Sequence, residues 1–212
     1  MHYSIFDERF SLLKSYHQDY LMEAGCDEAG RGCFAGPVFA AAVVLPRDFH
    51  HPQLNDSKQV PVEIRYELRT YIETHAVDYA VEQVSNEEID EINILKASFK
   101  AMHLAIEKLK KRPQLLLIDG HMFYKYKRVP HQCVIRGDGI YASIAAASIL
   151  AKTYRDDYMR QLHYEYPHYG WFNNKGYGTA EHRKGIETHG LCPYHRKSFN
   201  ILSAQMDIFG TE

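Results

Sequence analysis

The sequence of 212 residues predicts a single α/β domain with a mixed central β-sheet and a helical C-terminal extension. Apolar strand patterns gather in the first two thirds of the chain, helical patterns lie between and after them, and the C-terminal part is rich in aromatic residues and glycine. We expect a core over about residues 20–165 and the extension over about residues 166–212. Hydrophobic residues make up 45% of the chain and charged residues 25%, which excludes a disordered chain or a disulfide scaffold.

The first half of the chain contains three predicted strands. They are residues 21–27, 38–45 and 77–84. The second is apolar throughout, which predicts burial on both faces, and the third alternates apolar and polar residues as a half-buried strand does. Pro61 suits the first turn of a helix over residues 62–75. Ser85, with Glu88 three residues later, predicts a capping box at the start of a short helix.

The second half contains two more strands and three helices. The strands are expected at residues 114–118 and 132–135, and the helices at residues 93–111, 144–164 and 179–190. Asn93 and Thr179 are the expected N-caps, and an aromatic, glycine-rich loop occupies residues 166–178. Weak periodicity over residues 1–20 indicates a surface helix or arm, and a last apolar segment covers residues 201–209.

Several classes of protein are excluded by what the sequence lacks. No run of about 18 apolar residues is long enough for a membrane-spanning helix. The first residues lack the basic and apolar segments of a secretory signal. The four cysteines show no Cys-x-x-Cys spacing, so we expect reduced thiols in a cytoplasmic protein. They are Cys26, Cys33, Cys133 and Cys192.

Carboxylates stand at the ends of three predicted strands, where sites form in open α/β sheets. They are Asp27, Glu28, Asp119 and Asp138. Grouped acids repel one another unless a cation neutralises them, and hard divalent ions such as Mg²⁺ prefer carboxylate oxygen. Two such ions would support in-line phosphoryl displacement. Glu28 adjoins Asp27 and would point to the opposite face unless the strand bends at the glycines that follow. The alternative is that these are ordinary loop acids, with Asp119 in a simple turn.

Three further elements are candidates for binding a nucleic acid. Gly30, Arg31 and Gly32 would allow close approach of a sugar-phosphate and a bidentate contact to phosphate, unless they form a plain turn. Ser148 and Lys152 lie four residues apart on one helix face, with a solvated lysine as the alternative. Tyr177 lies between two glycines in a loop that precedes a helix. Its ring would stack on a sugar or base, or else anchor the loop in the core.

The net charge of −2 argues against a nucleic-acid-binding protein, but the charges are segregated along the chain. Residues 70–95 contain seven acidic residues and no lysine or arginine. Residues 108–136 contain eight lysines or arginines and the single acid Asp119. This distribution predicts that a basic segment surrounds the acidic site and attracts an anionic polymer. The alternative is an ordinary solvated helix end and hairpin.

Together the motifs resemble those of bacterial ribonuclease HII, the type 2 ribonuclease H family, from about Ala24 to Phe199. Seven occur in order, and their departures from the family pattern are Cys33, where proline is common, and His121, where asparagine is common. The motifs are Gly25–Gly32 with Gly36–Val38, Asn55–Lys58, Ile118–Gly120, Arg136–Asp138, Ile144–Lys152, Lys175–Thr179 and His195–Phe199.

The resemblance implies a ribonuclease H-like fold and Mg²⁺- or Mn²⁺-dependent endonucleolytic cleavage of RNA in RNA–DNA hybrids and at single ribonucleotides in duplex DNA. It implies metal binding by Asp27, Glu28, Asp119 and Asp138. It further implies that the ribose 2′-hydroxyl is sensed by Gly30, Arg31, Gly32 and Tyr177, and that the motifs near the nucleic-acid backbone include Lys58, Ser148 and Lys152. We expect a monomer that produces 3′-hydroxyl and 5′-phosphate ends.

Two other functions are compatible with the same residues. One is a different carboxylate-metal phosphoryl-transfer enzyme, such as a junction resolvase or a strand-transfer enzyme, which would not need the loop around Tyr177. The other is a hybrid-binding module without catalysis, in which the acids are structural. Cleavage of a duplex that carries one ribonucleotide, with and without a divalent metal, separates all three.

Overall fold

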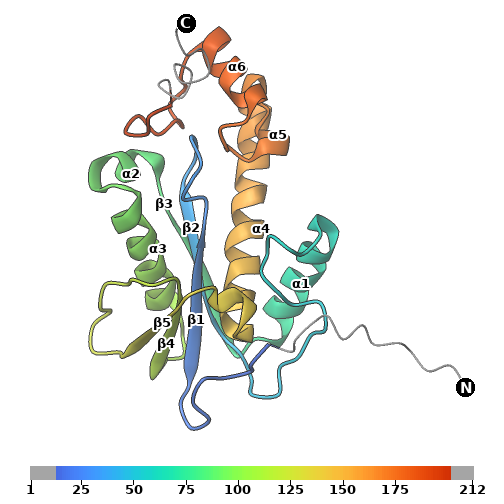
Figure 1. The fold of residues 1–212 in the computed structure, drawn as a ribbon, viewed down its shortest axis with the longest axis vertical. Coiled ribbons are helices and arrows are strands. Elements are labelled where there is room, and N and C mark those ends of the chain that lie inside the picture. The colour runs from blue at the N-terminus through green and yellow to red at the C-terminus, as the bar shows by residue number, and fades with distance from the viewer. Residues whose placement is uncertain (1–12, 202–212) are drawn as a thin grey trace, which may run out of the picture.

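Five strands form one sheet in the order β3-β2-β1-β4-β5 (Figure 1). They are β1 (Glu23–Ala29), β2 (Val38–Val44), β3 (Asp78–Val84), β4 (Leu115–Asp119) and β5 (His131–Val134). Strand β2 is antiparallel to both β1 and β3, whereas β4 is parallel to both β1 and β5, so the sheet is mixed as predicted. The computed structural model describes residues 13–201, and the predicted segments at 1–12 and 202–209 lie outside that range.

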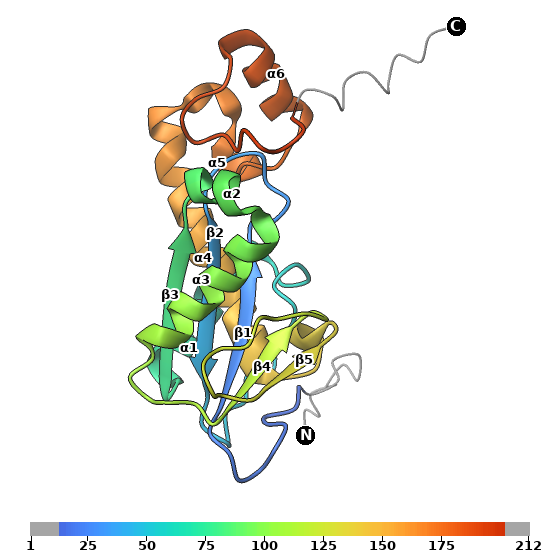
Figure 2. The ribbon, with the colours of Figure 1, turned by 90° about the vertical axis from the view of Figure 1, so that its left-hand side faces the viewer.

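Helices cover both faces of the sheet. Figure 2 shows α3 in front of the strands and α4 behind them, with α5 and α6 above the sheet. The helices are α1 (Val62–His75), α2 (Asn86–Ile92), α3 (Ile94–Lys108), α4 (Ala142–Glu165), α5 (Trp171–Asn174) and α6 (Ala180–His189), with 3₁₀ turns η1 (Gly137–Gly139) and η2 (Pro167–Tyr169). Among the described residues, no helix combines the length and apolar character needed to cross a bilayer.

Strand β2 is buried along its whole length, as its apolar run predicts. Its side chains alternate between two core clusters because successive Cβ atoms of a strand point to opposite faces. Ala40 and Ala42 pack in the cluster that includes α3, whereas Ala41 and Val43 pack in the cluster that includes α1 and α4. The small side chains of β2 therefore let helices pack closely on both faces of the central sheet.

The helix starts follow the predicted caps. Hydroxyl or amide oxygens of Ser85, Asn93 and Thr179 each accept a backbone N–H from the first turn of the helix that follows. The box at Ser85 is one-sided, because the Glu88 carboxylate binds Lys100. Two expectations differ in detail. Helix α3 ends at Lys108 rather than near residue 111, and the loop over residues 166–178 contains η2 and α5. Of the two alternatives for the N-terminal segment, residues 13–20 form an irregular arm and not a helix.

The backbone of α4 lies directly against β1 at Gly25. A Cβ atom at this position would lie 2.2 Å from the carbonyl carbon of Ser143 and 2.4 Å from the backbone nitrogen of Ile144. Such distances are impossible for non-bonded atoms, so only glycine permits this approach. The contact fixes the first turn of α4 on the same face of β1 as Asp27, since residues two apart on a strand share a face.

A series of hydrogen bonds between buried aromatic side chains holds the C-terminal extension together. His182 and His195 have no exposed surface. The backbone N–H of Cys192 donates to His195 Nδ1, the two Nε2 atoms are 3.1 Å apart, and Trp171 Nε1 donates to His182 Nε2. His195 Nε2 therefore carries the proton between the rings, and His182 Nδ1 donates to the carbonyl oxygen of Tyr177. Both histidines are neutral in this arrangement, and the last hydrogen bond of the series reaches the Tyr177 loop.

We predict that Gly25→Ala lowers the free energy of unfolding by about 3 kcal/mol, because backbone atoms of α4 cannot move aside as a flexible side chain can. Urea denaturation measures this change. Gly139→Ala is the matched control, since nothing lies within 4 Å of a Cβ at Gly139. Equal stability of the two variants would contradict the close contact between α4 and β1.

We also predict that the contribution of the buried histidine pair to stability falls between pH 7 and pH 5. Burial, with a smaller effect of neighbouring His182, lowers the pKa of His195 to about 4, whereas an unfolded histidine has a pKa of about 6.5. The neutral form stabilises the fold fully above pH 6.5, and this stabilisation is lost as the pH falls toward 4. The change is on the order of 2 kcal/mol.

Urea denaturation of the parent protein and of His195→Gln at the two pH values isolates this loss, since the variant should lose less stability, or gain more, than the parent protein as the pH falls. His121→Gln changes an exposed histidine in the same way and should behave as the parent protein does. A pH dependence unaffected by His195→Gln would show that titration of His195 does not contribute to the change in stability.

Candidate metal centre and nucleic-acid interface

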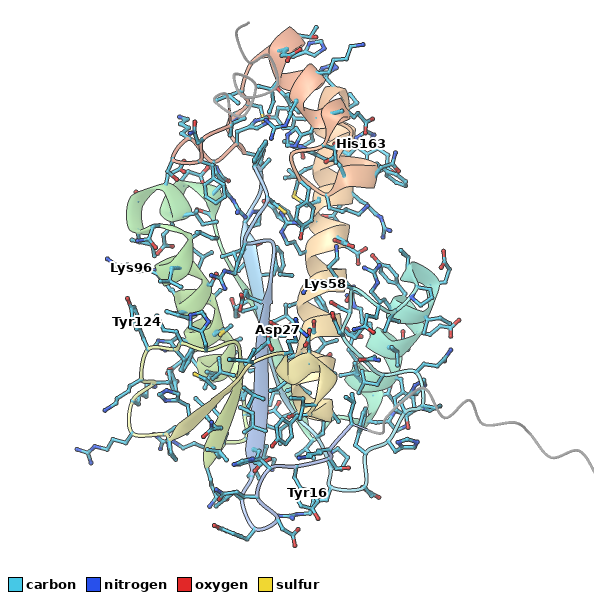
Figure 3. The ribbon with its side chains drawn as sticks, in the orientation of Figure 1. Tyr16, Asp27, Lys58, Lys96, Tyr124 and His163 are labelled. Atoms are coloured by element: carbon cyan, nitrogen blue, oxygen red, sulfur yellow. The ribbon has the colours of Figure 1, made fainter. Side chains whose placement is uncertain are left out.

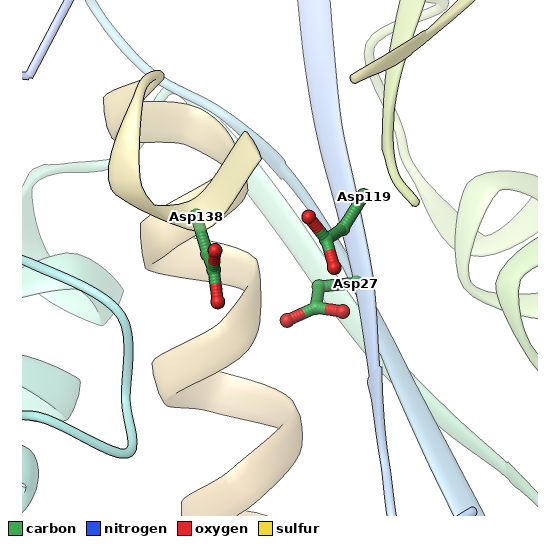
Figure 4. Close-up of side chains that lie close together, drawn as sticks. All are labelled: Asp27, Asp119 and Asp138. Atoms are coloured by element: carbon green, nitrogen blue, oxygen red, sulfur yellow. The ribbon is translucent and has the colours of Figure 1, made fainter. Parts of the chain in front are cut away.

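Three aspartates from different elements converge between β1 and α4 (Figure 4). Asp27 lies on β1, Asp119 is the last residue of β4, and Asp138 lies in the η1 turn that precedes α4. Each offers a carboxylate oxygen, and these oxygens lie within 4.8 Å of one another. Because β1 and β4 are parallel neighbours, their carboxyl ends bring Asp27 and Asp119 to the same edge of the sheet.

Burial and mutual repulsion both disfavour the negative charge of this cluster. Burial raises the pKa of Asp27 well above its usual range, and nearby Glu28 and Asp119 raise it further. Burial also raises the pKa of Asp138 to about 6, with added repulsion from Asp119 and Asp56. Carboxyl groups with raised pKa values are stabilised by a bound cation. The donor set is oxygen only, which fits a hard divalent ion such as Mg²⁺ or Mn²⁺.

A pair of hydroxyl groups supports Asp27 from α4. The Ser148 hydroxyl donates to Ser57 Oγ at 2.9 Å, and Ser148 also lies close enough to Asp27 to lower the pKa of that carboxyl group. Both serines are buried. The structure thus places Ser148, predicted near the nucleic-acid backbone, directly behind a candidate metal ligand.

Glu28 does not share the close cluster of the three aspartates. Its carboxylate accepts a hydrogen bond from the Arg31 guanidinium at 3.0 Å. Burial raises the pKa of Glu28, and the guanidinium partly offsets this effect. Glu28 still lies near enough to Asp27 and Asp119 to influence their charges. Its role as a fourth ligand remains a prediction, and its present partner is a side chain of the Gly30–Gly32 turn.

The segment Asn55–Lys58 places two charged residues near the site, Lys58 and Asp56. The exposed Lys58 is close enough to both Glu28 and Asp138 to lower their pKa values, and Figure 3 shows its label near that of Asp27. The negative charge of nearby Asp56 raises the pKa of the Asp138 carboxyl group. The sequence analysis did not single out Asp56, although it adjoins Lys58 in the same motif. Its position at the site depends on how this loop folds against η1.

The Gly30–Gly32 turn follows the end of β1 and faces the Tyr177 loop. Gly30 has a φ of +98°, which strongly favours glycine. The backbone N–H of Phe34 donates to the carbonyl oxygen of Gly176 at 2.8 Å, so the two segments are joined directly. The Tyr177 ring is 42% exposed. Burial of its phenol, together with the hydrogen-bonded Cys33 thiol, raises the pKa of Tyr177 to about 12. A neutral, partly exposed ring therefore stands beside a glycine turn.

Two lysines that the motifs contain are held by internal partners. Lys152 is mostly buried and pairs with the buried Asp156. Lys175 donates to main-chain carbonyls of Phe172 and Asn173. Burial lowers the pKa of both lysines. Contact of Lys152 with a nucleic-acid backbone stays a prediction, and in this structure its ammonium group stabilises the middle of α4.

The basic segment over residues 108–136 does not surround the aspartates as expected. Lys108 ends α3, and the basic residues that follow it precede β4, at the opposite end of that strand from Asp119. The connection from β4 to β5 runs along α3, where Lys127 pairs with Glu107. Figure 3 shows Tyr124 of this connection on the α3 side of the sheet. The sequence interpretation is wrong for these residues, because β4 separates them in space from its last residue, Asp119. Of the same basic segment, Arg136 is the N-cap of η1 and lies two residues before Asp138.

Comparisons with known proteins agree with this site. A family model described as Ribonuclease HII matches residues 24–202. A protein of Parabacteroides distasonis named Ribonuclease HII is 61% identical over 197 residues, which cover 93% of this chain and 99% of that protein.

Solved structures agree on the fold. The ribonuclease H2 of Pyrococcus horikoshii superposes with a TM-score of 0.71 at 24% identity, over 90% of this chain and 99% of that one. Bst-RNase HIII, solved in complex with Mn²⁺, gives a TM-score of 0.66 at 20% identity, over 89% of this chain and 70% of that one. The mixed sheet and flanking helices are thus a ribonuclease H-like fold, as predicted.

Family membership settles the class of reaction. Ribonuclease HII enzymes are hydrolases that use divalent metal ions, and the three-aspartate cluster provides a place for such ions in this chain. Since a relative identical at 61% of positions spans almost the whole length and the family model covers residues 24–202, the chain belongs to the ribonuclease HII family, whose enzymes cleave the RNA strand of RNA–DNA hybrids.

Proposed function

We propose that this enzyme also cleaves at single ribonucleotides embedded in duplex DNA. It hydrolyses the phosphodiester on the 5′ side of the ribonucleotide and leaves 3′-hydroxyl and 5′-phosphate ends. One observation carries the proposal. Strand β1 supplies Asp27 and leads directly into the Gly30–Gly32 turn, which is hydrogen bonded through Phe34 to the Tyr177 loop. A group that reads one sugar thus adjoins the carboxylates that would act on the neighbouring phosphate.

The candidate ligands are Asp27, Asp119 and Asp138, with Glu28 as the fourth carboxylate. Bound Mg²⁺ or Mn²⁺ would supply activation of water and stabilisation of the leaving oxygen. The protein keeps the ligands in place: Ser148 orients Asp27, and the backbone N–H of Gly137 donates to Asp119 at 2.7 Å. The exposed Lys58, close to Glu28 and Asp138, is suited to hold a substrate phosphate. No covalent intermediate with the enzyme is required.

Recognition of the ribonucleotide depends on the 2′-hydroxyl, which distinguishes RNA from DNA. The backbone of the Gly30–Gly32 turn is open to close approach, since nothing lies within 4 Å of a Cβ at Gly32. Arg31 would hold the adjoining phosphate, and the exposed face of Tyr177 would stack on the sugar. All of these residues belong to one chain, which supports action as a monomer. We expect the enzyme in the cytoplasm, because the bacterial DNA that would be its substrate lies there.

We expect Asp119→Asn to reduce cleavage of a duplex with one ribonucleotide by about three orders of magnitude or more, in either Mg²⁺ or Mn²⁺. The amide oxygen still accepts the Gly137 N–H, so the fold should be retained, while one negative charge of the candidate metal centre is lost. Gel analysis of the cleaved strand measures activity, calorimetry measures metal binding, and circular dichroism checks the fold.

Glu187→Gln is the control for Asp119→Asn, because Glu187 is an exposed acid on α6 outside the site. Full activity of Asp119→Asn would refute the metal assignment. Binding of the substrate by the parent enzyme without cleavage, in either metal, would instead favour a non-catalytic hybrid-binding module. Cleavage independent of the ribonucleotide would favour another phosphoryl-transfer enzyme of the same fold.

We expect Tyr177→Ala to lower kcat/KM on the single-ribonucleotide duplex by about 10- to 100-fold, since stacking on an aromatic ring contributes roughly 1–3 kcal/mol. Tyr177→Phe keeps the ring and should lose much less. Tyr164→Ala removes an exposed tyrosine of α4 outside both loops and serves as the control. Equal activity of Tyr177→Ala and the parent enzyme would exclude the stacking role.

A further inference from the structure

Two arginines are buried beneath the Gly30–Gly32 turn and the Tyr177 loop. Arg155 of α4 is 1% exposed, and Arg196, which follows α6, is 0% exposed. Neither forms an ion pair with a carboxylate within residues 13–201. The two guanidinium groups are close neighbours, because they donate to the carbonyl oxygens of the adjacent residues Ala35 and Gly36. Burial, together with the positive charge of Arg155, lowers the pKa of Arg196 to about 10, so Arg196 remains charged at neutral pH.

Arg155 binds main-chain carbonyl oxygens on both sides of the interface. Its Nη1 donates to Lys175 at 2.9 Å, in the loop that carries Tyr177. Its Nε donates to Pro37 at 3.0 Å and its Nη2 to Ala35 at 3.1 Å, both in the segment that follows the Gly30–Gly32 turn. One guanidinium therefore joins the two loops through three hydrogen bonds.

Arg155 also packs directly under Gly30. A Cβ atom at Gly30 would lie 2.0 Å from Arg155 Nε. A side chain at position 30 would therefore collide with Arg155 on the inner side of the turn. Glycine is needed here for that reason, in addition to any close approach of substrate on the outer side. The position of the turn and the position of the guanidinium depend on each other.

Arg196 holds the same turn from a second direction. Its Nη1 donates to the carbonyl oxygen of Arg31 at 2.9 Å, and its Nε donates to Gly36 at 2.9 Å. Its backbone N–H donates to Phe34, whose own N–H donates to Gly176 of the Tyr177 loop. The Nη2 atom is buried and has no hydrogen-bond partner among the described residues.

Packing alone does not explain why arginines, rather than apolar residues, are buried at these two positions. Burying an unpaired charge costs several kcal/mol, and apolar side chains of similar volume are often equally stable or more stable. A planar guanidinium has five N–H donors in a fixed geometry, so it can bind several carbonyl oxygens of separate segments at once. Lysine keeps the charge but cannot reproduce that geometry.

We propose that Arg155 and Arg196 are positioning residues for ribonucleotide specificity, which hold the Gly30–Gly32 turn and the Tyr177 loop in one fixed relative position. The proposal rests on the proposed function of these two loops. It adds that the recognition of the 2′-hydroxyl depends on two arginines that do not touch the substrate.

The test measures binding discrimination in the Asp119→Asn background, so that cleavage does not interfere. Fluorescence anisotropy gives the Kd for a duplex with one ribonucleotide and for the same duplex made of DNA alone. We expect Arg155→Lys and Arg196→Lys each to reduce the ratio of these two constants by roughly tenfold or more. The Kd for the DNA duplex and the calorimetric metal affinity should stay within about twofold, since neither arginine contacts the candidate ligands.

Arg69→Lys is the matched control, because Arg69 binds Glu73 and Asp157 away from both loops. Thermal unfolding identifies folded variants, and a destabilising effect alone would leave the discrimination ratio of the folded protein unchanged. The two arginines donate to different carbonyl groups, so one folded variant decides the question. Gly30→Ala, combined with Arg155→Lys in a double-mutant cycle, should be clearly non-additive.

An unchanged discrimination ratio in the folded lysine variants would overturn the proposal. Failure of the underlying function looks different. In that case the Asp119→Asn protein with both arginines intact would already bind the ribonucleotide duplex and the DNA duplex equally.

Discussion

The close contact between the first turn of α4 and β1 at Gly25 determines the geometry of the site. Asp138 lies just before α4, so this contact sets its distance from β1, which carries Asp27. The same contact aligns Ser148, farther along α4, with the Asp27 carboxylate. Packing of backbone against backbone thus holds together carboxylates that would otherwise separate by repulsion. Burial in this packing raises the pKa values of Asp27 and Asp138, and the neighbouring carboxylates raise them further.

Positive charge near the site comes from parts of the chain that are far apart in sequence. Lys58 lies in a loop before α1, Arg31 follows β1, and the buried Arg155 and Arg196 come from α4 and the C-terminal extension. The conspicuous basic segment over residues 108–136 lies largely elsewhere. A net charge of −2 is therefore compatible with a nucleic-acid enzyme, because a few cations at fixed positions act locally while salt screens distant ones.

The C-terminal extension is a structural part of the site rather than an appendage. Its neutral histidine pair ends on the carbonyl oxygen of Tyr177, and its Arg196 reaches the carbonyl oxygen of Arg31. Hydrogen bonds from Phe34 and Arg155 complete the link between extension and core. Buried polar groups that form several hydrogen bonds in this way specify one arrangement, since any slip leaves further donors or acceptors without partners. Two loops from opposite ends of the chain thereby become one surface.

The sequence alone predicted the five strands, the capped helices and four carboxylates at strand ends, because apolar periodicity, cap residues and strand ends are local properties. It also carried the motifs that led to the family. Only the tertiary structure decided that Glu28 pairs with Arg31, that Asp56 adjoins Asp138, and that the basic segment lies away from the site. Buried Arg155 lies seven residues after Ser148 on α4, a spacing compatible with the same buried face, yet no periodicity identifies its carbonyl partners. These partners come from loops, whose positions depend on contacts between residues distant in sequence.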